Sequence, residues 1–152
     1  MAESLSTDEA VRSLLLLMPR LVGRAKRLPV PEALRTLDLA PRHLALFAQL
    51  QYDGPLSVGE LADRLEIAPT TVSLMVAELS RRGALVRRED EADRRRRIIA
   101  IAPELAGSIE EWLGGTARAW TTALATLTGS ERHVVVRALR TFQEALGSAE
   151  PG

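Results

Sequence analysis

The chain has 152 residues, of which 46% are hydrophobic, enough for one compact unit with a buried core. It contains no cysteine, which excludes disulfides and zinc sites built on thiolates. Lysine and arginine (20) balance aspartate and glutamate (20), so an overall positive charge, the simplest sign of a nucleic-acid-binding protein, is missing.

Nothing in the chain suggests secretion or a membrane. The N-terminal stretch MAESLSTDEA is acidic and lacks the basic start of a signal peptide. The longest apolar run, from Leu14 to Met18, is too short to cross a bilayer. We therefore expect a cytoplasmic protein with no membrane partner.

The first predicted helix covers about residues 7–27. Its apolar side chains keep the helical period, and Leu16 and Leu17 add apolar surface on the other side, so the helix needs more than one packing partner. Pro19 removes a backbone hydrogen bond and predicts a kink or break near Met18. The sequence Leu-Pro-Val-Pro at residues 28–31 ends the helix.

A second helix is predicted to begin at Pro41, with Leu44, Phe47, Ala48 and Gln51 on one side. The turn signal Asp-Gly-Pro at residues 53–55 follows it.

Two short helices come next. Ser57 and Glu60 form the pattern of a capping box, which starts a helix of about two turns. Pro69 suits the first position of a new helix, because proline lacks the backbone N–H that is unpaired there. Helix, tight turn and helix in this order predict a helix-turn-helix.

The helix at residues 69–82 is the more informative of the two. Four apolar residues at helical spacing, Val72, Met75, Val76 and Leu79, predict its core side. The opposite face is small and hydroxylated, with Thr70, Thr71, Ser73, Leu74, Ala77, Glu78 and Arg81 on it or at its margins. Such a face can approach a DNA major groove closely, although Leu74 could also be an isolated surface leucine. Gly83 is placed to end the helix.

Two strand-length segments, residues 84–88 and 97–101, predict a hairpin, and its loop carries Asp93-Arg94-Arg95-Arg96. Arginine at an exposed tip suits a narrow minor groove, where the negative potential is focused, whereas the alternative is a solvated charged loop. Residues 81–97 hold eight arginines (81, 82, 87, 88, 94, 95, 96 and 97) and four acids (89, 90, 91 and 93). The positive charge is thus local, as a DNA-binding surface requires.

The C-terminal third predicts two helices. Apolar residues at helical spacing run from Leu105 to Leu127, with Gly114-Gly115 as a weak point, and Thr128 and Glu131 offer a capping box for the last helix. Neither helix is expected to belong to the winged module, that is, the second helix together with the helix-turn-helix and the hairpin that follow it. We expect the first helix and these two to interleave with a second subunit, although a monomeric helical cap is the alternative.

The sequence therefore predicts a mainly α fold with a small β-hairpin wing, a winged helix-turn-helix flanked by N- and C-terminal dimerisation helices. The expected domains are an N-terminal dimerisation helix and linker (5–34), the winged module (36–102) and the C-terminal dimerisation helices (103–147).

Four motifs in residues 57–101 resemble the MarR-type winged-helix transcription regulators. They are L-A-x-x-L at 61–65, T-V-S at 71–73, L-x-R-R-G at 79–83 and, most specific, D-R-R at 93–95. The chain departs from the family at Leu74, where many members carry a polar or basic side chain, at Ala68, where a capping serine is common, and at Ala102-Pro103-Glu104-Leu105, which replaces T-P-E-G. Having no cysteine, it lacks the peroxide-sensing thiol of some members.

The resemblance implies a homodimeric regulator, a repressor released by a small molecule, that reads a pseudopalindromic operator in double-stranded DNA. Helix 69–82 would enter the major groove and wing 85–100 the minor groove, with the two recognition helices roughly 34 Å apart. The candidate DNA-binding residues are Thr70, Thr71, Ser73, Leu74, Arg81, Arg82, Asp93, Arg94, Arg95, Arg96 and Arg97.

These residues have different expected roles. Arg94 and Arg95 would enter the minor groove, while Asp93 would fix the loop by pairing with an arginine or capping the turn. Arg81, Arg82, Arg96 and Arg97 would meet phosphates. The hydroxyls of the helix and Leu74 would give a modest direct readout, because no Arg, Lys, Asn or Gln lies on the exposed face before Arg81.

The only histidines, His43 and His133, have no partners at metal-ligand spacing, so each is expected to be structural or solvated. His43 is the candidate residue of a pocket for a small anionic or aromatic effector, since similar proteins bind such molecules there. Trp112 and Trp120 are expected in a core or interface. No cofactor or metal is expected.

Two other functions compete with the leading one. The first is a winged-helix protein-interaction module without DNA binding. The second is an enzyme, but no phosphate-binding loop, nucleophile with its base or metal cluster is visible in the sequence.

Overall fold

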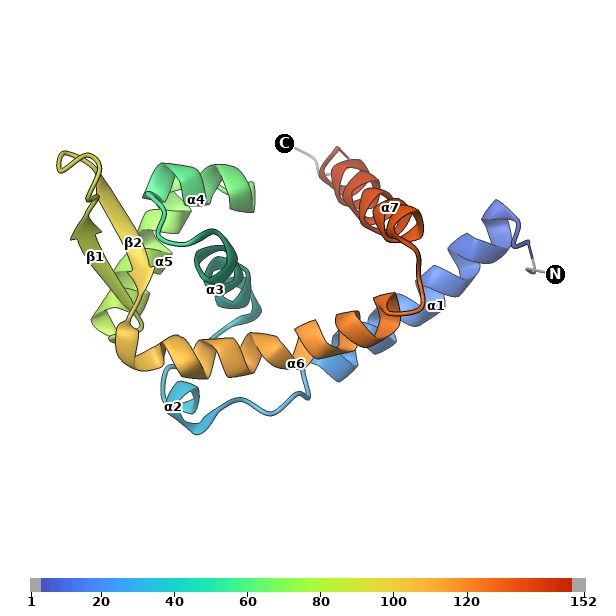
Figure 1. Cartoon of the computed structure of the whole chain (residues 1–152), viewed down its shortest axis with the longest axis horizontal. Coiled ribbons are helices and arrows are strands. Elements are labelled where there is room, and N and C mark those ends of the chain that lie inside the picture. Colours follow the sequence, from blue (N-terminus) through green and yellow to red (C-terminus); the bar gives the residue numbers. More distant parts are fainter. Residues whose placement is uncertain (1–3, 149–152) are drawn as a thin grey trace. The chain divides into compact units, whose positions relative to one another are not determined.

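A computed structural model describes residues 4–148 and divides the chain into two compact units, with the boundary between Gly115 and Thr116. The fold is mainly helical with one antiparallel hairpin, as predicted (Figure 1). The elements of the described residues are α1 (Thr7–Ala25), α2 (Glu32–Arg35), α3 (Pro41–Asp53), α4 (Val58–Leu65), α5 (Pro69–Arg81), β1 (Leu85–Glu89), β2 (Arg97–Ile101), a 3-10 turn (Pro103–Leu105), α6 (Ala106–Leu124) and α7 (Gly129–Gly147).

Helices α4 and α5 form the predicted helix-turn-helix. The capping box at the start of α4 is present: Glu60 N–H donates to Ser57 Oγ at 3.2 Å, and Ser57 N–H donates to Glu60 Oε2 at 2.8 Å. Glu66 turns the chain between the two helices through a left-handed conformation with φ 55°.

The end of α5 is a Schellman motif. Gly83 has φ 75°, and its N–H donates to Ser80 O at 3.0 Å. The next N–H, of Ala84, donates to Leu79 O at 2.8 Å. These two bonds satisfy helix carbonyls that would otherwise lack partners, so Gly83 ends the helix as predicted.

The core of the winged module contains the four predicted residues of α5, Val72, Met75, Val76 and Leu79, all buried. The inner side of α3 differs from the prediction. The fully buried stripe is His43, Leu46, Phe47 and Leu50, while Leu44 and Ala48 are only partly buried. The predicted and observed stripes share Phe47 and are offset by one position along the sequence. The observed stripe contains a histidine, so it is less apolar in sequence than a core stripe usually is.

The hairpin pairs Leu85 with Ile101, Arg87 with Ile99 and Glu89 with Arg97. Leu56, just before α4, forms an isolated β-bridge with Ile99 of β2. Leu56 N–H donates to Ile99 O at 3.1 Å, and Ile99 N–H donates to Leu56 O at 2.7 Å. This bridge, which the sequence did not predict, ties the wing to the start of α4.

Helix α1 is not broken at the position where the sequence predicted a kink or break. The helix runs from Thr7 to Ala25 with Pro19 inside it, and none of its residues is buried in the described chain. A proline leaves one carbonyl of the preceding turn unpaired, and on an exposed helix water can satisfy it. The exposed apolar residues are Val11, Leu14, Leu15, Leu16, Leu17, Leu21 and Val22.

The segments on either side of the winged module also contribute to its core. In the expected linker, the short helix α2 buries Leu34, and Leu37 follows it into the core. From α6, Ile109 and Leu113 join the same core. The expectation that the helix after the wing stands apart from the winged module is therefore wrong for the first half of α6.

Helix α6 continues through the glycine pair that was expected to be a weak point, and the boundary between the two compact units falls directly after this pair. A Cβ at Gly115 would lie 3.3 Å from Leu28 Cδ1, so the glycine permits close packing of the chain between α1 and α2.

In the second unit, α7 begins with the predicted capping box of Thr128 and Glu131. The helix buries none of its described residues. Its exposed apolar residues are Val134, Val136, Leu139, Phe142 and Leu146.

Candidate nucleic-acid interface

Most of the outer face of α5 is exposed. Thr70, Thr71, Ser73, Leu74 and Arg81 are all exposed, on the side of the helix opposite its four core residues. Leu74 is 72% exposed, the highest value among the exposed large apolar residues of the described chain. The helix thus presents hydroxyls and one apolar side chain outward.

The wing loop is held in shape by its own hydrogen bonds. Asp93 Oδ1 accepts from Arg95 N–H at 3.0 Å, and Asp93 O accepts from Arg96 N–H at 2.9 Å. Asp90 N–H donates to Arg96 O at 3.0 Å. Of the two roles expected for Asp93, the hydrogen bonds correspond to capping the turn.

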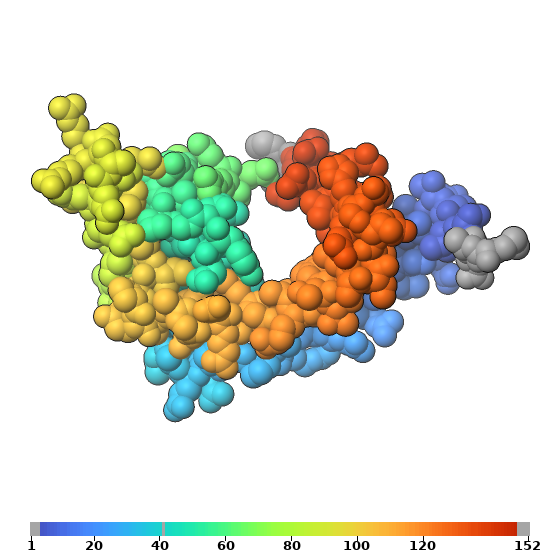
Figure 2. Space-filling view, in the orientation of Figure 1, coloured from blue at the N-terminus to red at the C-terminus, as the bar shows by residue number. Residues whose placement is uncertain are grey.

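Arg94 and Arg95 lie at the tip of this loop and are exposed. Neither guanidinium forms an ion pair with the described residues. In Figure 2 the tip protrudes from the winged module. Both side chains are therefore available to an external partner.

Arg96 is occupied within the chain. Its Nη2 pairs with Glu60 Oε2 at the start of α4, and its Nη1 lies 3.6 Å from Asp90 Oδ2. The Ser57 N–H and the Arg96 guanidinium, in that order, lower the pKa of the Glu60 carboxyl. The bond to Glu60 also raises the pKa of Arg96.

Arg82 is also occupied. It pairs with Glu78 one turn earlier on α5, at 2.6 Å, and donates to Leu37 O at 2.6 Å and to Asp38 O at 3.2 Å. It thus ties the end of α5 to the segment before α3. Of the four arginines expected at phosphates, Arg82 and Arg96 are therefore only partly exposed and held by two or more partners within the chain.

Arg97 pairs with Glu89 across the hairpin at 3.2 Å and remains exposed. Arg87 on β1 pairs with Ile99 on β2, and Ile99 lies two residues after Arg97. Because residues two apart on a strand point the same way, Arg97 and Arg87 share one face of the hairpin. The sequence analysis did not single out Arg87, although strand alternation could have placed it beside Arg97.

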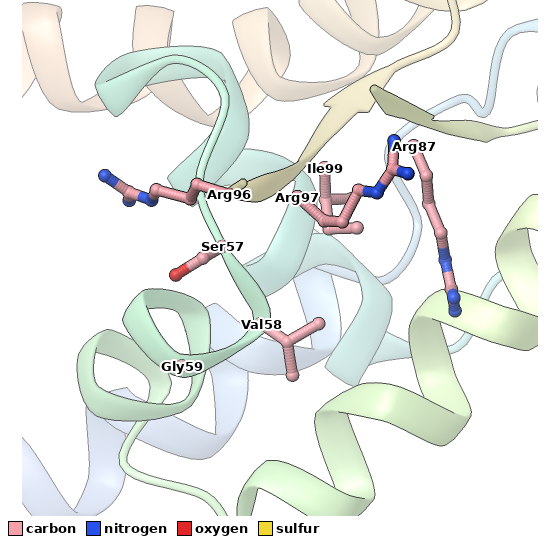
Figure 3. Close-up of a pocket in the computed structure, with 7 residues that line it drawn as sticks. All are labelled: Ser57, Val58, Gly59, Arg87, Arg96, Arg97 and Ile99. Carbon is pink, nitrogen blue, oxygen red and sulfur yellow. The ribbon is translucent and has the colours of Figure 1, made fainter. Parts of the chain in front are cut away.

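A groove of about 580 Å³ runs between the start of α4 and this face of the hairpin (Figure 3). Figure 3 shows the Arg96 guanidinium extending to the opposite side from Arg87 and Arg97. The lining residues are Ser57, Val58, Gly59, Arg87, Arg96, Arg97 and Ile99.

His43 is a helix cap. It is 1% exposed, and its Nδ1 accepts from Ala40 N–H at 3.0 Å at the start of α3. Burial, helped by the positive charge of Arg42, lowers its pKa. Its Nε2 has no hydrogen-bond partner among the described residues, and its side chain does not line the groove beside the hairpin.

The other residues considered from sequence are placed more simply. His133 is exposed on α7. Trp112 packs edge-on against Phe47 with ring centroids 6.4 Å apart, as expected for a core residue, whereas Trp120 is 46% exposed.

Across residues 4–148, no helix is both long and apolar enough to span a membrane. In the same range, no group of three or more His, Asp or Glu side chains is placed to hold a metal ion.

Comparison with known proteins identifies the family. The MarR family profile matches residues 37–96. The HTH-type transcriptional repressor MdtR of Bacillus subtilis is 31% identical over 104 residues, which are 66% of this chain and 67% of MdtR.

Solved structures share the fold. The YusO protein from Bacillus subtilis is 25% identical with a TM-score of 0.53, covering 93% of this chain and 99% of YusO. The PcaV transcriptional regulator from Streptomyces coelicolor, solved with its natural ligand, is 20% identical with a TM-score of 0.60, covering 96% of this chain and 99% of PcaV. The chain belongs to the MarR family of DNA-binding transcription regulators.

Proposed function

We propose that the protein binds a pseudopalindromic operator as a homodimer, with α5 in the major groove and the wing in the minor groove. The observation that carries this proposal is the pairing, within one module, of a small outward helix face with a protruding arginine tip. A helix with short side chains lies deep in the major groove, and arginine suits a narrow minor groove.

Direct base readout is modest in this proposal. Thr70, Thr71 and Ser73 supply hydroxyls to base edges or phosphates, and Leu74 contacts thymine methyl groups. Since the exposed face has no side chain for bidentate base recognition before Arg81, DNA shape supplies the rest of the specificity.

These arginines divide into three groups. Arg94 and Arg95 enter the minor groove, while Arg81, Arg97 and the newly noted Arg87 contact phosphates. Arg82 and Arg96, first expected at phosphates, are assigned to holding the module in shape, because each is only partly exposed and its guanidinium has at least two partners in the chain. Arg97 pairs with Glu89 but stays exposed, so it keeps its assignment to phosphates.

The homodimer is proposed because α1 and α7 leave so much apolar surface exposed. Contiguous apolar patches on a soluble protein mark interaction sites, and both helices lack buried residues in the described chain. By two-fold symmetry, a second copy would place two α5 helices roughly 34 Å apart, about one turn of DNA. Segments 5–34 and 103–147 remain the proposed dimerisation regions, with the first half of α6 shared with the winged module.

We further propose repression that is released by a small anionic or aromatic effector. MdtR is named a repressor, and PcaV was solved with its natural ligand. A hollow of about 250 Å³ is lined by Arg35, Asp38, Trp112 and three apolar side chains. Its indole ring and apolar side chains suit an aromatic effector, and Arg35 supplies a cation beside the Asp38 carboxylate, whereas His43 is buried away from this hollow. This role would place the protein in the cytoplasm.

Selection of bound sequences from a random duplex pool with the purified chain tests this function. We expect enrichment of an inverted repeat with half-sites one helical turn apart, and binding that weakens steeply with salt. No enrichment and no duplex binding even at low salt would contradict the proposal and favour a protein-interaction module.

A further inference from the structure

We propose that Glu60 and Arg96 are positioning residues, whose ion pair fixes the base of the wing on α4 so that Arg94 and Arg95 are presented to the minor groove. The proposal rests on the proposed function and deepens it. It assigns DNA-binding importance to an acidic residue that touches no DNA.

The fixed end of this link is the Glu60 carboxylate. It accepts the Ser57 N–H at 2.8 Å in the capping box, which holds it at the first turn of α4. Its second partner is the Arg96 guanidinium. The carboxylate is therefore an anchor within the helix-turn-helix, oriented by the helix backbone.

The other end of the link is the loop backbone. Arg96 O accepts from Asp90 N–H at 3.0 Å, and Arg96 N–H donates to Asp93 O at 2.9 Å. These bonds close the turn that carries Arg94 and Arg95. Arg96 thus connects two parts of the module, because its backbone closes the turn and its side chain binds Glu60 on α4. A loop that is already held in this way loses less conformational entropy on binding DNA than a free loop would.

The charges argue against a phosphate contact for Arg96. Its guanidinium lies between the carboxylates of Glu60 and Asp90, so the group as a whole presents no positive charge. Arg95, in contrast, has no ion-pair partner among the described residues. The two neighbouring arginines should therefore respond differently to substitution.

Glu60→Gln is a sharp test, because the two explanations predict opposite changes in the affinity for operator DNA. Electrostatics alone predicts tighter binding, because an acid near DNA is removed. Positioning predicts about fivefold weaker binding to the selected operator, with an unchanged salt slope because no phosphate contact is lost. Arg96→Gln should weaken binding to a similar extent, and the double variant should be no more than about twofold weaker than either single variant.

Ser57→Ala is the matched control. It removes the Ser57 Oγ half of the same capping box but keeps the backbone bond to Glu60 and the pair with Arg96. Operator affinity should stay at the wild-type value well below the melting temperature. Loss of affinity in Ser57→Ala as large as in Glu60→Gln would overturn the proposal, since general weakening of α4 would then explain both.

A measurement on the free protein separates this inference from the proposed function. Near neutral pH, NMR exchange of the Asp90 and Arg96 amides with water should be several-fold faster in Glu60→Gln and unchanged in Ser57→Ala. If wild type fails to bind DNA, the proposed function is wrong, and unchanged amide exchange in Glu60→Gln would overturn the link itself. If wild type binds and Glu60→Gln binds equally or more tightly, the inference fails while the proposed function stands.

Discussion

At the scale of single residues, the arginines show what one sequence can and cannot predict. The motif placed Asp93 to Arg97 on a wing, but four adjacent arginines look alike in sequence. Arg96 is distinguished by its ion pairs with Asp90 and with Glu60, the latter thirty-six positions earlier. Arg82 is likewise distinguished by carbonyls of residues 37 and 38, a tertiary contact that no local pattern encodes.

Arg95→Ala should weaken operator binding at every sequence and reduce the salt slope by about one, because one phosphate-region cation is lost. Fluorescence anisotropy across a salt series measures both quantities. Leu74→Ala is the uncharged comparison: it should alter sequence preference and leave the slope unchanged. Binding by Arg95→Ala that matches wild type would show that the wing assignment is wrong.

His43 predicts a pH dependence of folding. Its neutral Nδ1 accepts the Ala40 N–H, and burial lowers its pKa from the usual 6.5, so the unfolded chain binds more protons below that pH. Stability should be complete above pH 6.5 and fall as the pH drops below it, by at most about 1.4 kcal/mol per pH unit.

Urea unfolding at pH 7.5 and 5.5 measures this effect, and His43→Gln should flatten it. The carboxyls with lowered pKa, Glu60 among them, have usual values of 4.5, so their stabilisation is lost only at lower pH. An equal pH slope in wild type and His43→Gln would argue against the buried neutral cap.

At the scale of elements, local signals were sufficient where local chemistry decides the structure. Both capping boxes of the sequence analysis, the glycine that ends α5 and the hairpin were predicted because each depends on residues a few positions apart. Helix α2, the Leu56 bridge and the buried stripe of α3 were missed, since each is decided by packing against distant residues.

Gly83→Ala tests the end of α5. A side chain at φ 75° is strained, so the variant should lose about 1 kcal/mol of unfolding free energy. Gly107→Ala is the control, because it lies inside α6 and its added Cβ meets nothing within 4 Å. Denaturant unfolding should show the control equally or more stable than wild type, and a neutral Gly83→Ala would contradict the strain.

At the scale of the whole molecule, the overall composition gave no sign of DNA binding, whereas the distribution of charge along the sequence did. A formal net charge of zero concealed a basic cluster in residues 81–97, which the order of the residues shows. The sequence also predicted that α1 needs more than one packing partner, and its leucines are exposed in the single chain. In the proposed homodimer a second copy covers those leucines, and such contacts belong to an assembly, so the sequence of one chain predicts the need for a partner but no individual contact with it.

Leu15→Glu tests that need, because Leu15 is 68% exposed on α1 and a charge there would be buried in a dimer. The variant should sediment as a monomer at concentrations where wild type is a dimer, and operator binding should fall. Leu74→Ala, which changes an exposed leucine of α5, should leave the dimer intact. A dimeric Leu15→Glu would exclude this position from the interface.

The most direct test of the central claim is the mass of the complex between the protein and its selected duplex, measured by analytical ultracentrifugation. The account predicts two chains on one duplex that carries two half-sites about 10 base pairs apart, dissociating together as salt rises. One chain per duplex, or no complex at low salt, would contradict it.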